Sequence, residues 1–205
     1  MAIIDLAEPS KRERAKAANR QAILEAARRV FADLGYDATT VRDIIRGTEL
    51  ASGTFYNYFK SKEEVFEALQ DDSAYRFRPL LREQCERAET FEEFVRGALD
   101  AYFHFLAEEK AQGRIMQRPD SPFTHRVDTP EMKAIFEEVR MQIQTAIGRG
   151  LAPDLDPDYL AAASIGLARE VGERMLMRGG DDVAHASAFC AGLLLRGVGG
   201  AGQRG

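Results

Sequence analysis

The stretch from Thr40 to Lys62 constrains the fold most strongly, because it places two short helical patterns on either side of a polar break. The first pattern carries three apolar residues at the intervals of one helical face, namely Val41, Ile44 and Ile45. Gly-Thr-Glu at 47–49 interrupts it, and the second pattern starts near Ser52. Two short helices joined by a tight turn predict a helix-turn-helix, the motif that lays its second helix in the DNA major groove.

Phe55 and Phe59 orient the second helical pattern, because residues four positions apart lie on the same face of a helix. We expect both rings to enter the hydrophobic core of a three-helix head. The polar residues around them then face outward or lie at the rim: Thr54, Tyr56, Asn57 and Tyr58. Gly53 has no side chain, so its backbone can approach another surface closely.

Both ends of this stretch carry residues suited to helix capping. Thr39 or Thr40 can cap the helix before the break. Ser61 and Glu64 have the spacing of a capping box, which starts the following helix. Lys62 therefore lies in a first helical turn, where free N–H groups and the helix dipole attract anions, and we expect it to contact a phosphate.

Residues 1–17 are charged and lack a clear apolar period, so they predict a flexible N-terminal arm. The arm carries four basic residues: Lys11, Arg12, Arg14 and Lys16. They either contact DNA phosphates or belong to a solvated tail, and the sequence favours neither interpretation. From Asn19 apolar residues recur at helical intervals, and Gly35 suits the left-handed position that often ends a helix.

Capping and proline signals divide the rest of the chain into further helices, and no alternating strand pattern is present, so the predicted fold is all-α. The helix from Ser61 is expected to end before Pro79, and the last helix to reach Leu195 or Arg196. Three further helix starts are predicted: Thr90 in a capping box with Glu93, Thr129 before Pro130, and Asp156 before Pro157.

Charge is spread unevenly along the chain, although the net charge of −5 does not by itself indicate a nucleic-acid partner. Residues 1–62 hold 11 Lys and Arg against 8 Asp and Glu, whereas the remainder holds 17 against 25. A mildly basic head on an acidic body is compatible with DNA binding. No apolar run reaches the ~20 residues of a membrane span and no signal peptide is recognisable, so we expect a cytoplasmic protein.

Residues able to carry catalytic or metal chemistry are scattered. His104, His125 and His185 lie far apart, and no metal-binding, paired-carboxylate or phosphate-loop motif is present. The sequence therefore predicts no enzyme, no metal and no cofactor. Cys85 and Cys190 are isolated, which favours small buried residues over a redox sensor.

Residues 20–69 resemble the tetracycline-repressor (TetR) family of bacterial transcriptional regulators. The matching sequences are ILEAARRVFADLGYDATTVRDI and SGTFYNYFKSKEEVFEAL. The resemblance implies a dimer of all-helical subunits, with DNA-binding heads and a ligand pocket inside the body. The residues that we predict to meet DNA are Thr40, Arg42, Ser52, Gly53, Thr54, Tyr56, Asn57, Tyr58 and Lys62. Asn57 falls at a variable position, where its amide pairs with adenine or instead contacts a phosphate or water.

The turn departs from the family pattern, which usually reads Ala-Gly-Val-Ser where this chain has Thr-Glu-Leu-Ala at 48–51. Glu49 stands where glycine suits a left-handed backbone, at a cost of about 1 kcal/mol if the geometry is kept. Ala51 replaces the usual serine cap, and Ser52 is placed to take over that role. The start of the recognition helix depends on these substitutions.

The resemblance divides the chain into a DNA-binding domain at 18–64, a helical ligand-binding and dimerisation domain at 65–197, and a flexible glycine-rich tail at 198–205. Aromatic and methionine side chains of the body form either ordinary core or the lining of a hydrophobic pocket. The pocket candidates are Tyr102, Phe103, Met116, Phe123, Phe136 and Met141.

Small residues between 161 and 172 permit close helix packing, either within one subunit or between two. We predict a homodimer through residues 157–196, whose two heads read a palindromic DNA operator. The predicted function is a repressor that a small hydrophobic ligand releases from DNA. The alternative is a DNA-binding regulator whose body binds a protein partner and has no small-molecule inducer. Residue chemistry is compatible with an activator as well.

Overall fold

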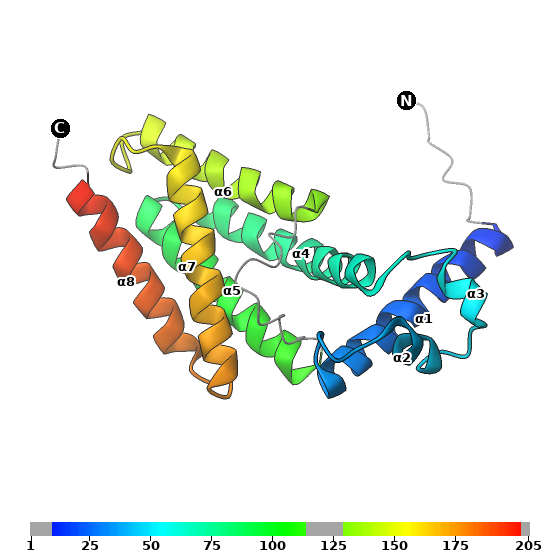
Figure 1. The fold of residues 1–205 in the computed structure, drawn as a ribbon. Helices are drawn as coiled ribbons and strands as arrows, with labels where there is room; N and C mark the ends of the chain where they lie inside the picture. The colour runs from blue at the N-terminus through cyan, green and yellow to red at the C-terminus, as the bar shows by residue number, and fades with distance from the viewer. Residues whose placement is uncertain (1–9, 114–128, 202–205) are drawn as a thin grey trace, which may run out of the picture. The chain divides into compact units, whose positions relative to one another are not determined.

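The computed structural model describes residues 10–113 and 129–201, with side chains up to residue 197, and all regular structure in these ranges is α-helical (Figure 1). This confirms the all-α prediction. The helices are α1 (Lys11–Leu34), α2 (Val41–Arg46), α3 (Ser52–Phe55), α4 (Lys62–Arg87), α5 (Phe91–Ala111), α6 (Pro130–Gly148), α7 (Pro157–Met177) and α8 (Val183–Ala201). The described residues up to Leu69 form one compact unit, the head, and those from Gln70 form a second, the body.

The head is organised around the C-terminal half of α1, which buries one apolar stripe against α2, α3 and the start of α4. The stripe and its partners are Ile23, Leu24, Ala27, Phe31, Ile44, Phe55, Phe59, Val65, Phe66 and Leu69. Phe31, Tyr36 and Phe66 form an aromatic cluster, with ring centroids separated by 4.9–6.0 Å. Edge-on and tilted ring pairs of this kind add stability beyond their buried area.

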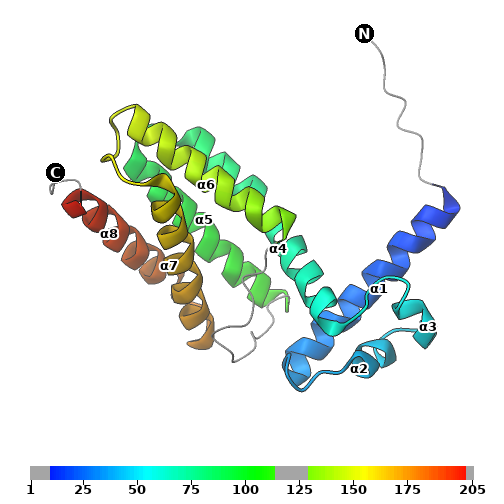
Figure 2. The same cartoon turned by 45° about the horizontal axis from the view of Figure 1, so that its top comes forward.

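In the body, α5 packs against α7 and α8, and α6 packs against α7 (Figures 1 and 2). The C-terminal half of α4 supplies Phe77, whose ring centroid lies 5.4 Å from those of Tyr102 and Phe105 on α5. Phe103 is fully buried. Gly172 of α7 permits this packing, because a Cβ there would lie 2.6 Å from a methyl carbon of Leu106.

Ion pairs join the body portion of α4 to its neighbours. Arg78 reaches Glu131 at 3.2 Å and Glu138 at 3.0 Å, both on α6, and Arg82 also pairs with Glu138. Arg76 pairs at 2.6 Å with Glu109 of α5, a carboxylate that is almost fully buried. A buried carboxylate of this kind requires a charged partner, so these contacts hold α4 in register with α5 and α6.

Pro79 does not end α4, contrary to the prediction. The helix continues through Pro79 to Arg87. An interior proline removes one backbone hydrogen bond and commonly costs about 3 kcal/mol. Phe77 and Leu81 are buried on either side of Pro79, and Arg78 and Arg82 anchor the same turns to α6. These long-range contacts offset the local penalty.

Both ends of the helical region extend further than predicted. α1 begins at Lys11 because Ser10 and Glu13 form a capping box, so residues 11–17 of the predicted flexible arm are helical. α8 continues to Ala201, beyond Leu195 or Arg196 and into the predicted tail. The capping boxes or caps predicted at Thr90, Thr129 and Asp156 are confirmed. The remainder of the arm, residues 1–9, and of the tail, residues 202–205, lies outside the described ranges.

Neither a membrane-spanning helix nor a metal-binding cluster is found among the described residues. None of the described helices has the length and the low content of charged residues that a membrane span requires. Within the same ranges, no group of three or more His, Cys, Asp and Glu side chains is placed to hold a metal ion.

Candidate nucleic-acid interface

Thr40 caps α2. Its hydroxyl oxygen accepts a hydrogen bond from the backbone N–H of Asp43, and the Asp43 carboxylate accepts one from the backbone N–H of Thr40 at 3.0 Å. The hydrogen bonds from Thr40 lower the pKa of Asp43. Thr39 is instead buried, with its hydroxyl donating to the carbonyl oxygen of Gly35 at 2.7 Å. Thr40 and the exposed Arg42 thus lie at the N-terminus of α2, where they were predicted.

The turn between α2 and α3 is held by contacts from two residues that sequence reasoning did not single out. The Thr48 hydroxyl donates to the carbonyl oxygen of Ile45 at 2.8 Å and accepts from the N–H of Leu50 at 3.2 Å. Arg29 of α1 donates to the carbonyl oxygen of Gly47 at 3.1 Å. These contacts stabilise a turn whose sequence departs from Ala-Gly-Val-Ser. Side chains that bond their own local backbone commonly perform this function.

Ser52 is the first residue of α3, and Ala51 is its N-cap without a side-chain hydrogen bond. Ser52 therefore does not take over the capping role. After Phe55 the chain keeps turning, since the N–H of Asn57 bonds the carbonyl of Thr54 and that of Phe59 bonds the carbonyl of Phe55. We call Ser52–Phe59 the recognition segment.

The recognition segment has one buried face and one exposed face. Phe55 and Phe59 are 1% and 5% exposed, which confirms their predicted inward orientation. The segment's predicted DNA-contacting residues lie on its other face. Thr54 and Tyr58 are half-buried, and the remaining four are exposed: Ser52, Gly53, Tyr56 and Asn57. A Cβ added to Gly53 would meet no heavy atom within 4 Å, so the surface there is open to a partner. The arrangement presents hydroxyl and amide groups on a rigidly anchored short segment, which is the chemistry that reads base edges and phosphates.

Lys62 lies in the first turn of α4, but its ammonium is already engaged. It donates hydrogen bonds to the backbone carbonyl oxygens of Tyr36, Asp37 and Thr39 at 2.9, 3.3 and 2.9 Å. It also lies 4.5 Å from the centroid of the Tyr36 ring. An ammonium has three N–H donors, so a contact to DNA phosphate requires it to leave at least one carbonyl.

Glu63 reinforces the same junction, because its carboxylate accepts a hydrogen bond from the Tyr36 hydroxyl at 3.1 Å. Burial and the neighbouring charge of Glu63 raise the pKa of Tyr36, so the hydroxyl remains a donor at neutral pH. The Ser61 hydroxyl and, to a lesser degree, Tyr36 lower the pKa of Glu63. The start of α4 is thereby tied to the connection that leads from α1 into α2.

The candidate pocket residues of the body are not assembled around a large cavity in the described ranges. Phe103 is fully buried, and Tyr102 and Phe136 are partly buried and pack against the core. Met141 is 57% exposed on α6, so it lies on the surface rather than in the interior. Met116 and Phe123 lie outside the described residues.

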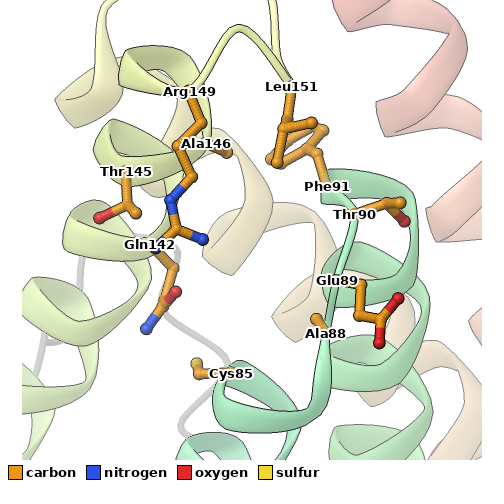
Figure 3. Close-up of a pocket in the computed structure, with 10 residues that line it drawn as sticks. All are labelled: Cys85, Ala88, Glu89, Thr90, Phe91, Gln142, Thr145, Ala146, Arg149 and Leu151. Carbon is orange, nitrogen blue, oxygen red and sulfur yellow. The ribbon is translucent and has the colours of Figure 1, made fainter.

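A small cavity of about 30 Å³ lies instead between the C-terminal end of α4, the start of α5 and the end of α6 (Figure 3). Cys85, Phe91, Ala146 and Arg149 are among its lining residues. Burial raises the pKa of the Cys85 thiol to about 11, and burial likewise raises that of Cys190 to about 11. Thiols with a raised pKa are poor nucleophiles, which fits the prediction that both cysteines are structural. A separate open groove lies between α5 and α8, beside Arg96, Asp100 and Ser187.

Comparison with known proteins extends these observations. The family described as bacterial regulatory proteins, tetR family, matches residues 23–69, the segment that forms the core of the head. The uncharacterized HTH-type transcriptional regulator YhgD of Bacillus subtilis is 30% identical over 149 residues, which cover 68% of this chain and 74% of YhgD. The HTH-type transcriptional repressor DhaR of Mycobacterium sp. (strain GP1) is 32% identical over 158 residues, which cover 70% of this chain and 77% of DhaR.

The fold is also similar to that of solved structures. The transcriptional regulator FadR from Bacillus subtilis, crystallised in complex with stearoyl-CoA, matches with a TM-score of 0.69 and 22% identity. The match covers 87% of this chain and 98% of the FadR chain. The structural likeness therefore extends through the body, whose sequence alone did not indicate a family.

Proposed function

This chain belongs to the tetR family of bacterial regulatory proteins, and on that premise we propose that it is a homodimeric repressor released from its operator by a small hydrophobic ligand. Its relatives are transcriptional regulators rather than enzymes, and the chain is likewise a DNA-binding transcriptional regulator. Repression, the pairing of two heads and release by a ligand are the parts that we propose beyond the family.

The recognition segment carries the proposal. Phe55 and Phe59 anchor it in the head core, and its polar residues remain free to meet DNA. We assign direct contacts to Thr40, Arg42, Ser52, Gly53, Thr54, Tyr56, Asn57 and Tyr58. Within this set Asn57 is the base reader, because its amide can donate and accept together at an adenine edge. Lys62 contributes by placing α2 against α4, since its three donors are occupied within the head.

The proposed dimer forms through α7 and α8. Large apolar side chains remain exposed on both helices: Tyr159, Met177, Phe189 and Leu193. Among the small residues, Ala161, Ala168 and Gly172 face the core of their own subunit, whereas Ala163 is exposed and a Cβ on Gly166 would meet nothing within 4 Å. The outward small residues allow a second pair of helices to approach closely, as in a four-helix interface.

A hydrophobic ligand is supported by the character of the body and by FadR, whose structure holds stearoyl-CoA. The aromatic core of α4 and α5 offers an apolar environment around Phe77, Tyr102 and Phe105. Ligand sites usually occupy ~300–1,000 Å³, whereas the cavity beside Cys85 has only about 30 Å³ and the groove of about 380 Å³ between α5 and α8 is open to solvent rather than enclosed. Binding is therefore expected to separate body helices, and the free energy for that separation comes from preferential binding to the opened state.

The small size of that cavity also favours the second candidate, a regulator whose body binds a protein partner. Such a body needs no enclosed pocket, and the described core of the body is closely packed. The two candidates share the same DNA-binding head. They differ in whether an apolar small molecule lowers DNA affinity.

Selection of duplexes from random DNA, followed by binding measurements over a range of salt concentrations, tests the DNA-binding function. We expect an enriched palindromic sequence bound by two chains, with a steep fall in affinity as salt rises. Adding stearoyl-CoA to the complex then tests release. A chain that shows no preference among duplexes contradicts the proposal, and a preference that no apolar compound alters favours the protein-partner candidate.

A further inference from the structure

The N-terminal part of α1 extends beyond the packed head. The helix begins at Lys11, yet its first fully buried side chain is that of Ile23. Residues 11–18 are all exposed, so about two turns of helix have little of the described chain beneath them. An isolated helix of this length is only marginally stable in water, and the Ser10–Glu13 capping box supports only its first turn.

The basic residues of this extension are not randomly placed. Arg12, Lys16 and Arg20 follow one another in steps of four residues, and the next step reaches Leu24, which is 2% exposed. Residues four apart form a continuous ridge on a helix. The ridge that enters the head core at Leu24 therefore continues toward the N-terminus as a row of three cations, which we call the basic row.

Arg20 fixes the position of the basic row within the head. Its guanidinium carbon lies 5.3 Å from the centroid of the Phe59 ring, the last residue of the recognition segment. From Arg20 to Arg12 the helix runs for about 12 Å. Each DNA strand carries one phosphate per ~3.4 Å of the duplex axis, so a row of this length can reach more than one phosphate of a strand.

Glu13 is the one acidic residue of the extension. Its carboxylate accepts a hydrogen bond from the Ser10 N–H at 2.7 Å, and the hydrogen bonds from Ser10 lower its pKa. It therefore acts as part of the helix cap and remains charged. Lys11 and Arg14 do not belong to the basic row, since they lie on other faces of the same turns.

We propose that the basic row of α1 binds phosphates of the DNA that flanks the bases contacted by the recognition segment. The inference rests on the proposed DNA-binding function and adds a second contact surface to it. DNA is the favoured occupant because the row is cationic, is exposed and adjoins the end of the recognition segment through Arg20 and Phe59. Phosphate contacts of this kind set affinity and register without reading sequence.

The test compares two variants with the same loss of charge. One is R12Q/K16Q, in the basic row, and the other is K11Q/R14Q, on other faces of the same turns. Each variant is titrated against two duplexes that contain the sequence selected with the wild-type chain. The trimmed duplex holds only the bases needed for the preference, and the long duplex adds arbitrary sequence on both sides. Far-UV circular dichroism checks that both variants keep the helical content of the wild type.

On the long duplex, we expect R12Q/K16Q to reduce the magnitude of the slope of log K against log salt by about 2 per bound subunit. Each lost phosphate contact accounts for ~0.9 of this change. The control pair is expected to keep the wild-type slope, and the trimmed duplex is expected to respond little to either change. An unchanged slope in R12Q/K16Q overturns the inference, as does an equal loss in both pairs, which indicates diffuse attraction. Wild-type protein that prefers no duplex removes the proposed function and this inference together.

Discussion

Lys62, at the start of α4, and Tyr36, in the connection between α1 and α2, are joined twice. The Lys62 ammonium donates a hydrogen bond to the Tyr36 carbonyl oxygen at 2.9 Å and lies 4.5 Å from the centre of the same residue's ring. Two further carbonyls of the connection, those of Asp37 and Thr39, bind the same ammonium. The lysine therefore acts as a clamp inside the head.

Replacing Lys62 with methionine keeps the aliphatic stem and removes the clamp. We expect the free energy of unfolding to fall by about 1–3 kcal/mol, because the carbonyl groups lose a charged donor. DNA affinity should fall with no change in the salt slope, whereas loss of a phosphate contact reduces that slope by about 1. Denaturant unfolding and DNA titrations measure the two effects, and Lys60→Met, at an exposed neighbour, is the control. Unchanged stability with a reduced slope identifies Lys62 as a phosphate ligand instead.

Gly53→Ala separates folding from DNA binding. The added methyl group meets no atom within 4 Å, so it introduces no clash in the free protein. Alanine in place of a helical glycine is expected to stabilise α3 by about 0.5–1 kcal/mol. DNA affinity is nevertheless expected to fall, because the close approach of backbone to DNA at this position is lost. Thermal unfolding measures the stability of the variant, and DNA titration of the same preparation measures its affinity. An unchanged affinity rules out a close approach of DNA at Gly53.

Asn57→Ala tests the proposed base reader. Loss of a paired amide contact is expected to cost about 1–3 kcal/mol on the preferred duplex and to relax preference at one base position. Repeating the duplex selection with the variant shows whether a single position loses its preference. A uniform loss of affinity across all sequences assigns Asn57 to a phosphate instead.

Leu193→Glu tests the proposed dimer interface. Leu193 is 50% exposed on α8, and burial of a carboxylate against a second subunit is strongly unfavourable. We expect the variant to sediment as a monomer and to lose most of its affinity for a palindromic duplex. Leu151→Glu, at a residue 47% exposed just after α6, is the control and should leave the wild-type mass unchanged. Equal behaviour of the two variants argues against an interface through α8.

The two cysteines are expected to resist alkylation. Burial raises each thiol pKa to about 11. Since the thiolate is the reactive form, raising the pKa from an ordinary ~8.5 lowers the thiolate fraction at pH 8 by about two orders of magnitude. Labelling with iodoacetamide, followed by mass spectrometry, should be slow in the folded chain and fast in guanidinium chloride. Rapid labelling of the folded chain at either site reopens the redox interpretation.

Local features of the chain were readable from residue order. The spacing of Phe55 and Phe59 predicted which face of the recognition segment is buried, and the burial of both rings confirms it. Caps at Thr90 and Asp156 were equally readable, whereas the cap of α2 was predicted at Thr39 or Thr40 and the structure has it at Thr40. These patterns depend on residues within about one helical turn of one another, so they can be recognised without knowledge of the tertiary structure.

Only the tertiary structure decided the contacts between distant residues. The Lys62 clamp joins residues 23–26 positions apart, the Arg29 bond to Gly47 spans 18, and no local rule pairs them. Pro79 stays within α4 because Arg78 and Arg82 reach α6, more than 50 positions away. Thus the short-range physics of spacing and capping determined the helices and their buried faces. Packing and ion pairing between remote segments decided what Lys62 binds and where α4 ends.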